Sequence, residues 1–173
     1  MNKYITLFEQ FLNNADLDYK LHETDPVEGL GYLTFKMNGD YCRMDVVFDA
    51  DPERDMVMCF VYLPFSIPPE KRHGMAELVC RLNRRAVGNY EYDIDDLSLR
   101  FKISMDVEGG ELVPRMIENM RDSAVSVCDN DFPVMMRFLY GDFSPKAAYE
   151  AGRPAGDATT EPEDKPPQGV VMQ

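Results

Sequence analysis

Apolar and polar residues alternate with a two-residue period on both sides of Asn38-Gly39, and this pattern predicts a β-hairpin. The first strand reads YLTFKMN and the second reads YCRMDVVFD. One face of the second strand carries Cys42, Met44, Val46 and Phe48. The opposite face is more polar, so the sequence predicts a sheet with one buried side and one wetter side.

Two further segments have the character of strands. The nearly all-apolar run MVMCFVYLPF, residues 56–65, predicts a strand at the centre of the sheet. The runs YEYDI and LSLRFKISMDV predict a second hairpin that turns at Asp95-Asp96.

Three other segments have apolar residues at helical spacing. Residues 4–15 carry an amphipathic stripe, and a second helix is predicted from the Pro68-Pro69 pair to about Ala86, with Gly88 as its stop. A third helix begins near Val113. The order of elements favours a mainly antiparallel α+β domain over a doubly wound one.

The C-terminal part of the chain predicts two more helices. CDNDFP, residues 128–133, predicts a break followed by a further helix with Asp131 as its cap. FSPKAAYEA predicts a short last helix with Ser144 as its cap and Pro145 at its first position.

Composition places one domain boundary near residue 152. Residues 1–152 have enough apolar content for a single folded domain. Residues 153–173 are rich in Pro, Gly, Thr and acids, and they predict a disordered tail because too little apolar area is available to offset chain entropy.

The formal net charge of −13 argues against nucleic acid or an anionic membrane as a partner, since both would be repelled. No segment reads as a signal peptide or as a membrane span, so a cytoplasmic protein is expected. The cysteines are scattered and have apolar neighbours, which predicts buried reduced thiols: Cys42, Cys59, Cys80 and Cys128.

A basic cluster interrupts this acidic chain, formed by Arg81, Arg84, Arg85 and Arg100. The first three fall in the last turns of the predicted second helix, where cations complement the negative end of the helix dipole. Glu91 and the aspartates after it can neutralise them. The sequence therefore favours a junction between helix and hairpin over a phosphate or nucleic-acid site.

The inventory of reactive groups is small. His22 and His73 are the two histidines, and neither has a partner at metal-ligand spacing. No motif for a nucleophile, a phosphate loop, a metal or another cofactor is present, so catalysis is not expected. The alternative is a small-molecule-binding or weakly enzymatic domain with a polar pocket near His22, Glu23 and Asp25.

The chain contains 12 methionines, a residue type that makes adaptable apolar surfaces. Where the third helix meets its neighbour, four of them either line the core or form a partner or dimer surface: Met116, Met120, Met135 and Met136.

The run LNRRAVGNYEYDIDDLSLRFKISMDVEGG, the helix near Val113 and the closing FLYGDFSPKAAYEA together resemble the YbjN domain, a bacterial family of sensory transduction regulators. The matching positions are Leu82, Asn83, Gly88, Tyr90, Asp93, Phe101, Ser104, Gly141, Ser144, Pro145 and Ala148. Tyr90 stands where the family has Phe, and Lys146-Ala147 depart from the usual residues. The resemblance follows the order of elements over residues 1–152.

The resemblance implies a fold like that of type III secretion chaperones: a twisted, mainly antiparallel sheet of five to six strands with helices on one face. It implies a homodimer that binds other polypeptides, with no catalytic residue and no cofactor. The leading hypothesis is a non-enzymatic protein-binding regulator or chaperone-like module of the bacterial cytosol, acting through a sheet or helix surface.

Overall fold

The computed structural model describes residues 2–25 and 30–152, so the predicted C-terminal tail at 153–173 lies outside the described residues. Its strands are β1 (Tyr19–Asp25), β2 (Leu30–Asn38), β3 (Arg43–Asp51), β4 (Met56–Tyr62), β5 (Asn89–Tyr92) and β6 (Leu99–Asp106). Its helices are α1 (Lys3–Asn14), the 3₁₀ turn η1 (Pro69–Lys71), α2 (Arg72–Leu82), α3 (Pro114–Tyr140) and α4 (Pro145–Gly152).

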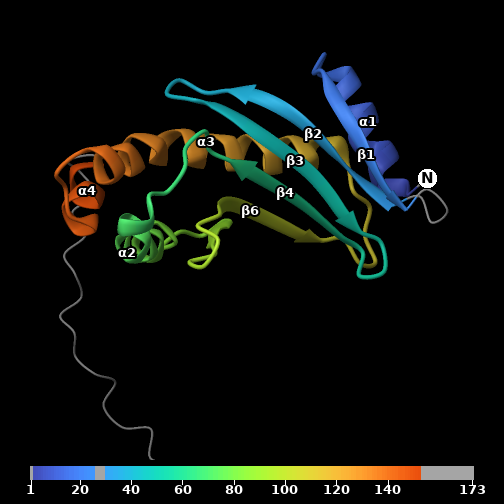
Figure 1. Cartoon of the computed structure of the whole chain (residues 1–173). Coiled ribbons are helices and arrows are strands. Elements are labelled where there is room, and N and C mark those ends of the chain that lie inside the picture. The colour runs from blue at the N-terminus through green and yellow to red at the C-terminus, as the bar shows by residue number, and fades with distance from the viewer. Residues whose placement is uncertain (1, 26–29, 153–173) are drawn as a thin grey trace, which may run out of the picture.

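The strands form one six-stranded sheet in the order β1-β2-β3-β4-β6-β5, and every neighbouring pair is antiparallel. Helices α1 and α3 pack on one face of this sheet, and α3 runs behind it in Figure 1. Helices α2 and α4 pack against each other at one end of the sheet. The predicted α+β class, with its antiparallel sheet, is confirmed.

The core fills the space between the sheet and the helices. At its centre the Phe48 side chain of β3 is fully buried, and its ring stacks on Phe8 of α1 with 4.8 Å between ring centroids. Phe35 of β2 lies 4.9 Å away from Phe48 by the same measure. The alternating positions Met44, Val46 and Phe48 all face this core, as the sequence pattern predicts.

The predicted first hairpin is present as β2 and β3, and an aspartate of α3 holds its turn. The backbone N–H groups of Asp40, Tyr41 and Cys42 donate to the Asp129 carboxylate at 2.8, 3.0 and 3.2 Å. A Cβ at Gly39 would lie 2.1 Å from a carboxylate oxygen of Asp129, so this close approach requires glycine. Cys42 therefore belongs to the turn and not to the strand.

Helix α2 is shorter than predicted, because it ends at Leu82 and not near Ala86. The cause is the side chain of Asn83, which makes two hydrogen bonds with the backbone of β5. Its amide nitrogen donates to the Tyr90 carbonyl at 3.0 Å, and its amide oxygen accepts from the Tyr90 N–H at 2.7 Å. These bonds turn the chain away from the helix axis toward the sheet.

The sequence predicted Gly88 as the stop of the second helix. In the structure the helix ends earlier, and Gly88 directly precedes β5. Its φ of 69° is in the left-handed region, and a Cβ there would lie 2.4 Å from the Phe101 ring. Glycine is therefore required by the entry into β5.

The predicted break at residues 128–133 is wrong, because α3 is one helix of 27 residues that contains Pro133 and ends at Tyr140. Proline leaves the carbonyl four residues earlier without its helical donor. Tertiary contacts on both sides outweigh this cost: Cys128 and Val134 are buried in the same core. Asp131 is accordingly not a cap; its carboxylate pairs with Arg85 at 2.6 Å.

The last helix is confirmed. Pro145 is its first residue, and the Ala147 N–H donates to the Ser144 hydroxyl at 3.2 Å. In the part of the chain that the structure describes, no helix has the length and apolar character to cross a membrane.

The four cysteines are free thiols, and they differ in exposure. Cys59 and Cys128 are buried, and burial raises the pKa of both thiols. Cys42 is half-buried, and burial together with Asp129 raises its pKa to about 11. Cys80 is exposed on α2, which corrects the prediction that all four are buried.

Candidate interaction site

The side of the sheet opposite α1 and α3, here called the outer face, is not covered by any helix among the described residues. Strand alternation and register identify the side chains that point to the outer face. Its charged members are Lys20, Asp25, Lys36, Arg43, Asp45, Asp49, Asp51, Glu91, Arg100, Lys102 and Asp106. Its larger apolar and aromatic members are Tyr32, Val47, Met56, Met58, Phe60 and Tyr62.

Phe60 lies at the centre of the outer face and is covered by two cations of β6. The Arg100 guanidinium is 4.4 Å from its ring centroid and the Lys102 ammonium is 5.7 Å away. These side chains leave Phe60 only 7% exposed although no helix covers it. The charged groups of Arg100 and Lys102 therefore lie over the ring and help to shield it from water.

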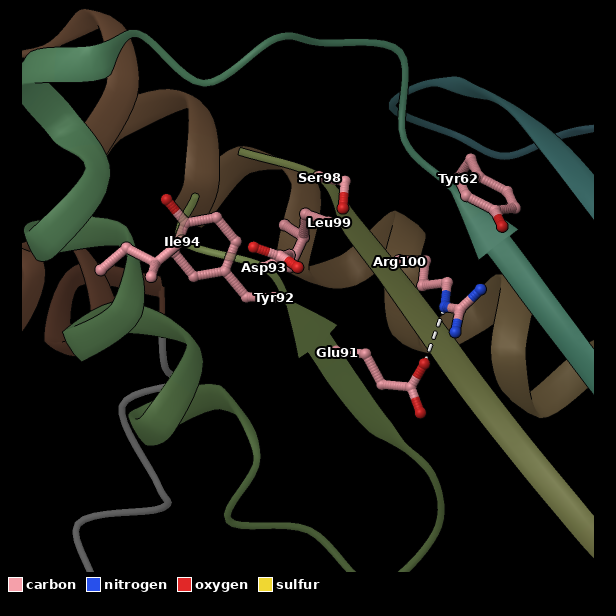
Figure 2. A pocket seen from close by; sticks show the side chains of 8 residues that line it. All are labelled: Tyr62, Glu91, Tyr92, Asp93, Ile94, Ser98, Leu99 and Arg100. Atoms are coloured by element: carbon pink, nitrogen blue, oxygen red, sulfur yellow. Dashed lines mark hydrogen bonds and ion pairs between the residues drawn. The ribbon is translucent and has the colours of Figure 1, made fainter. Parts of the chain in front are cut away.

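A cavity of about 700 Å³ opens beside this cluster, between the end of β4 and the β5–β6 hairpin. Figure 2 shows Tyr62 at the tip of β4, the ion pair of Glu91 with Arg100 in the middle, and Tyr92 and Ile94 on the side of α2. Its lining mixes aromatic, charged and hydroxyl groups.

Glu91 binds both cations of the cluster. Its carboxylate accepts from Arg100 Nε at 2.7 Å and lies 3.3 Å from Lys102 Nζ. Partial burial raises the pKa of Glu91, but the bonds and charges of Arg100 and Lys102 outweigh burial, and the net pKa is below the ordinary 4.5.

Replacing Glu91 with glutamine is expected to lower the free energy of unfolding by about 0.5–1 kcal/mol near neutral pH, as for other partly exposed ion pairs. Because the folded-state pKa is depressed, the stabilisation is present above pH 4.5 and is lost as the pH falls through the folded pKa. Urea unfolding of both proteins at about pH 7 and about pH 3 measures this. A difference that grows on acidification contradicts the assignment.

Charges on the outer face are separated along the strand direction. The half near the β2–β3 turn carries five cations and two carboxylates, which gives +3: Lys20, Lys36, Arg43, Arg100 and Lys102 against Asp45 and Glu91. The half near the β3–β4 turn carries four carboxylates, which gives −4: Asp25, Asp49, Asp51 and Asp106. Burial raises the pKa of Asp49, and the neighbouring Asp51 raises it too.

The predicted polar group His22, Glu23 and Asp25 does not converge. His22 pairs with Tyr32 and Asp25 with Leu30, which places both on the outer face, whereas Glu23 points to the other side. The His22 ring stacks on the ring of Tyr32, with 4.8 Å between centroids, and its Nε2 lies 3.0 Å from the Thr34 hydroxyl.

None of these three residues lines any of the four cavities described for this chain. Within residues 2–25 and 30–152, no group of three or more His, Cys, Asp and Glu side chains is arranged to hold a metal ion.

The methionines divide between core and surface. Met120 and Met135 are buried within the chain, so they belong to the core and not to a partner surface. Met116 and Met136 are partly buried against the same core. The sequence left open whether the four methionines line the core or form a partner surface. Burial assigns Met120 and Met135 to the core.

Sequence reasoning missed Arg100 and Lys102 as a surface cluster, although a signal was present. In LSLRFKISMDV the residues Arg100, Lys102 and Ser104 alternate with buried Phe101 and Ile103. Reading the polar half of that alternation locates the outer face.

The YbjN family model, described as "Putative bacterial sensory transduction regulator", matches residues 5–136, and residues 141–148 of the resemblance lie after this stretch. A similar solved structure is titled "Crystal structure of YbjN, a putative transcription regulator from E. coli". It is 12% identical, with a TM-score of 0.55 over 72% of this chain and 85% of that chain.

No curated protein matches the chain. At this identity the solved structure shows the shared fold alone, and the likeness to type III secretion chaperones stays a prediction. The family match is different in kind, because it spans most of the described domain. The chain belongs to the YbjN family.

Proposed function

We propose that the chain is a non-enzymatic, protein-binding regulator of the bacterial cytosol, and that the outer face of its sheet is a binding surface whose partner is a second copy of the chain. The family description, which names a bacterial regulator, supports the regulatory role. The observation that carries the second part is the opposite charge of the two halves of the uncovered outer face.

A face with one positive and one negative half is complementary to itself. When two copies stack face to face about a two-fold axis perpendicular to the strands, the half near the β2–β3 turn of one copy lies over the half near the β3–β4 turn of the other. Each strand then lies over the same strand of the second copy, so Arg43 of β3 lies opposite Asp51, and Lys36 of β2 lies over Tyr32 beside Asp49. The same contact occurs twice, since the interface is isologous.

The outer face is large enough for such a dimer. Six strands about 4.8 Å apart and about seven residues long, at about 3.3 Å per residue, give an area on the order of 650 Å² per chain. The two faces together bury on the order of 1,300 Å², which is within the range of specific protein interfaces. Tyr32, Val47 and Met58 supply half-buried apolar contacts in the middle.

Charge reversal in the basic half is expected to weaken the dimer. In the Lys36→Glu/Arg43→Glu variant two attractive contacts become repulsive on each side of the two-fold axis, and the dimer dissociation constant is expected to rise about 10- to 100-fold. Sedimentation equilibrium at low ionic strength measures this, and about 1 M NaCl is expected to weaken the native dimer as well.

The matched control is Arg115→Glu/Lys146→Glu, which reverses two exposed cations on α3 and α4, away from the sheet. Its dissociation constant is expected to stay within about twofold of the native value. A native chain that remains monomeric at low ionic strength up to high micromolar concentration contradicts the proposal, as does equal weakening in both variants.

A further inference from the structure

A second cavity, of about 570 Å³, lies on the other side of the molecule from the outer face, where the end of α2, the β2–β3 turn, the second half of α3 and the end of α4 meet. Three arginines line this cavity, here called the arginine pocket: Arg84, Arg85 and Arg137. Tyr41 and Tyr149 contribute aromatic rings to its wall.

Charge is concentrated in the arginine pocket. Asp131 is the one carboxylate among its lining residues, so three guanidinium groups and one carboxylate give a charge of +2 in a chain of −13. Asp131 is already engaged: it accepts from Arg85 at 2.6 Å and from the Tyr90 hydroxyl at 3.0 Å. The pocket therefore keeps a positive field that an anion can occupy.

Arg85 is held rigidly at the base of this pocket. Its Nε donates to the Leu82 carbonyl at 2.6 Å, one of the carbonyls left open where α2 ends. Its guanidinium lies over the rings of Tyr90 and Phe101, 5.5 and 5.6 Å from their centroids, and the side chain is 19% exposed. A guanidinium fixed in this way loses little conformational entropy on binding a ligand.

Arg84 and Arg137 are exposed on the rim. Among the ion pairs of the described residues, none involves either side chain. Arg137 donates to the Ala151 carbonyl at 3.1 Å, which brings the end of α4 against α3. A Cβ at Gly152 would lie 2.2 Å from a methyl group of Val134, so glycine allows this wall of the pocket to close.

We infer that the arginine pocket binds the phosphate group of a small molecule. Guanidinium groups bind phosphate oxygens through paired, charge-assisted hydrogen bonds, and here a fixed arginine and two adjustable ones surround one space. The volume is that of a small-molecule site. Arg84 and Arg85 both lie beyond the last residue of α2. Arg85 keeps the helix-end role that the sequence favoured, through its bond to the Leu82 carbonyl, and phosphate binding adds to that role.

Isothermal titration calorimetry with inorganic phosphate, pyrophosphate and ADP, at constant ionic strength, tests the inference on the full chain. Saturable one-to-one binding is expected for at least one probe. ADP binding more tightly than pyrophosphate supports a nucleotide as the ligand, and equal affinities support recognition of the phosphate group alone.

The Arg84→Ala/Arg137→Ala variant is expected to bind about tenfold or more weakly, since two charge-assisted contacts are lost. The Arg54→Ala/Arg115→Ala control removes two exposed arginines elsewhere and is expected to bind within about twofold of the native protein. A third variant, Arg84→Lys/Arg137→Lys, keeps the charge without the planar fork and is expected to bind with intermediate affinity.

Two results overturn the inference. One is the absence of saturable binding of all three probes at millimolar concentration. The other is equal weakening in the pocket variant and its control, which identifies non-specific attraction. Neither outcome bears on the outer face, because the pocket and the face share no residue.

Discussion

Replacing Phe48 with alanine is expected to lower the free energy of unfolding by about 3–5 kcal/mol, a large part of the stability of a typical domain. Phe48 is fully buried, and its ring contacts Phe8 of α1 and Phe35 of β2. Its loss leaves a cavity between the first helix and the sheet, where β3 cannot move because both of its neighbours hold its register. Urea unfolding followed by far-UV circular dichroism measures the change.

The control for this substitution is Phe143→Ala, since Phe143 is 43% exposed in the connection before α4. Its effect is expected to be within about 1 kcal/mol. If Phe48→Ala costs no more than the control, the core is not centred where α1 meets β3.

Replacing Asp131 with alanine is expected to cost about 3 kcal/mol, because it leaves the Arg85 guanidinium largely buried without its carboxylate. The Tyr90 hydroxyl loses its acceptor in the same change. Burial raises the pKa of Asp131 although Arg85 lowers it, so the ion pair itself contributes little net stability. The cost of the variant comes from the charge that remains.

This reasoning predicts that a second substitution recovers stability. The Arg85→Leu/Asp131→Ala variant removes both charges and is expected to have a free energy of unfolding about 1–2 kcal/mol higher than that of Asp131→Ala. Urea unfolding of the native chain, both single variants and the double variant closes the cycle. A double variant that is less stable than Asp131→Ala contradicts this account of the pair.

The strands and the class of fold could be predicted from sequence because their signals are local. Period-two alternation placed Met44, Val46 and Phe48 on one face, and the structure buries all three. The start of α4 could be predicted for the same reason, since its cap Ser144 and its first residue Pro145 are adjacent in sequence.

Helix ends were predicted less well because partners distant in sequence decide them. Asn83 ends α2 through bonds to Tyr90, and the buried faces on both sides of Pro133 carry α3 through the predicted break. Neither contact can be recognised from the few residues next to the end of the helix.

The two candidate sites depend on the same kind of distant contact. The sequence shows Arg84 and Arg85 beside each other, but Arg137 joins them only when α3 continues past Pro133. His22 and Glu23 are neighbours in sequence, and strand alternation separates them onto opposite faces. Charge separation on the outer face follows from strand register, which the sequence does not specify between β3, β4 and β6.

The central claim is that the outer face binds a second copy with its positive half over the negative half. Mixing two variants tests this directly: Lys36→Glu/Arg43→Glu, in which both halves of the face are acidic, and Asp49→Lys/Asp51→Lys, in which the half near the β3–β4 turn changes from −4 to 0. Circular dichroism of each variant confirms folding, since Asp51 also accepts hydrogen bonds from the Glu53 and Arg54 backbone.

Sedimentation equilibrium of the two variants, alone and in an equimolar mixture, gives the decisive comparison. Each variant alone is expected to be monomeric at concentrations where the native chain is a dimer, and the mixture is expected to form a heterodimer because every repulsive contact becomes attractive. A mixture that stays monomeric, or two variants that each dimerise as tightly as the native chain, contradicts the proposed interface.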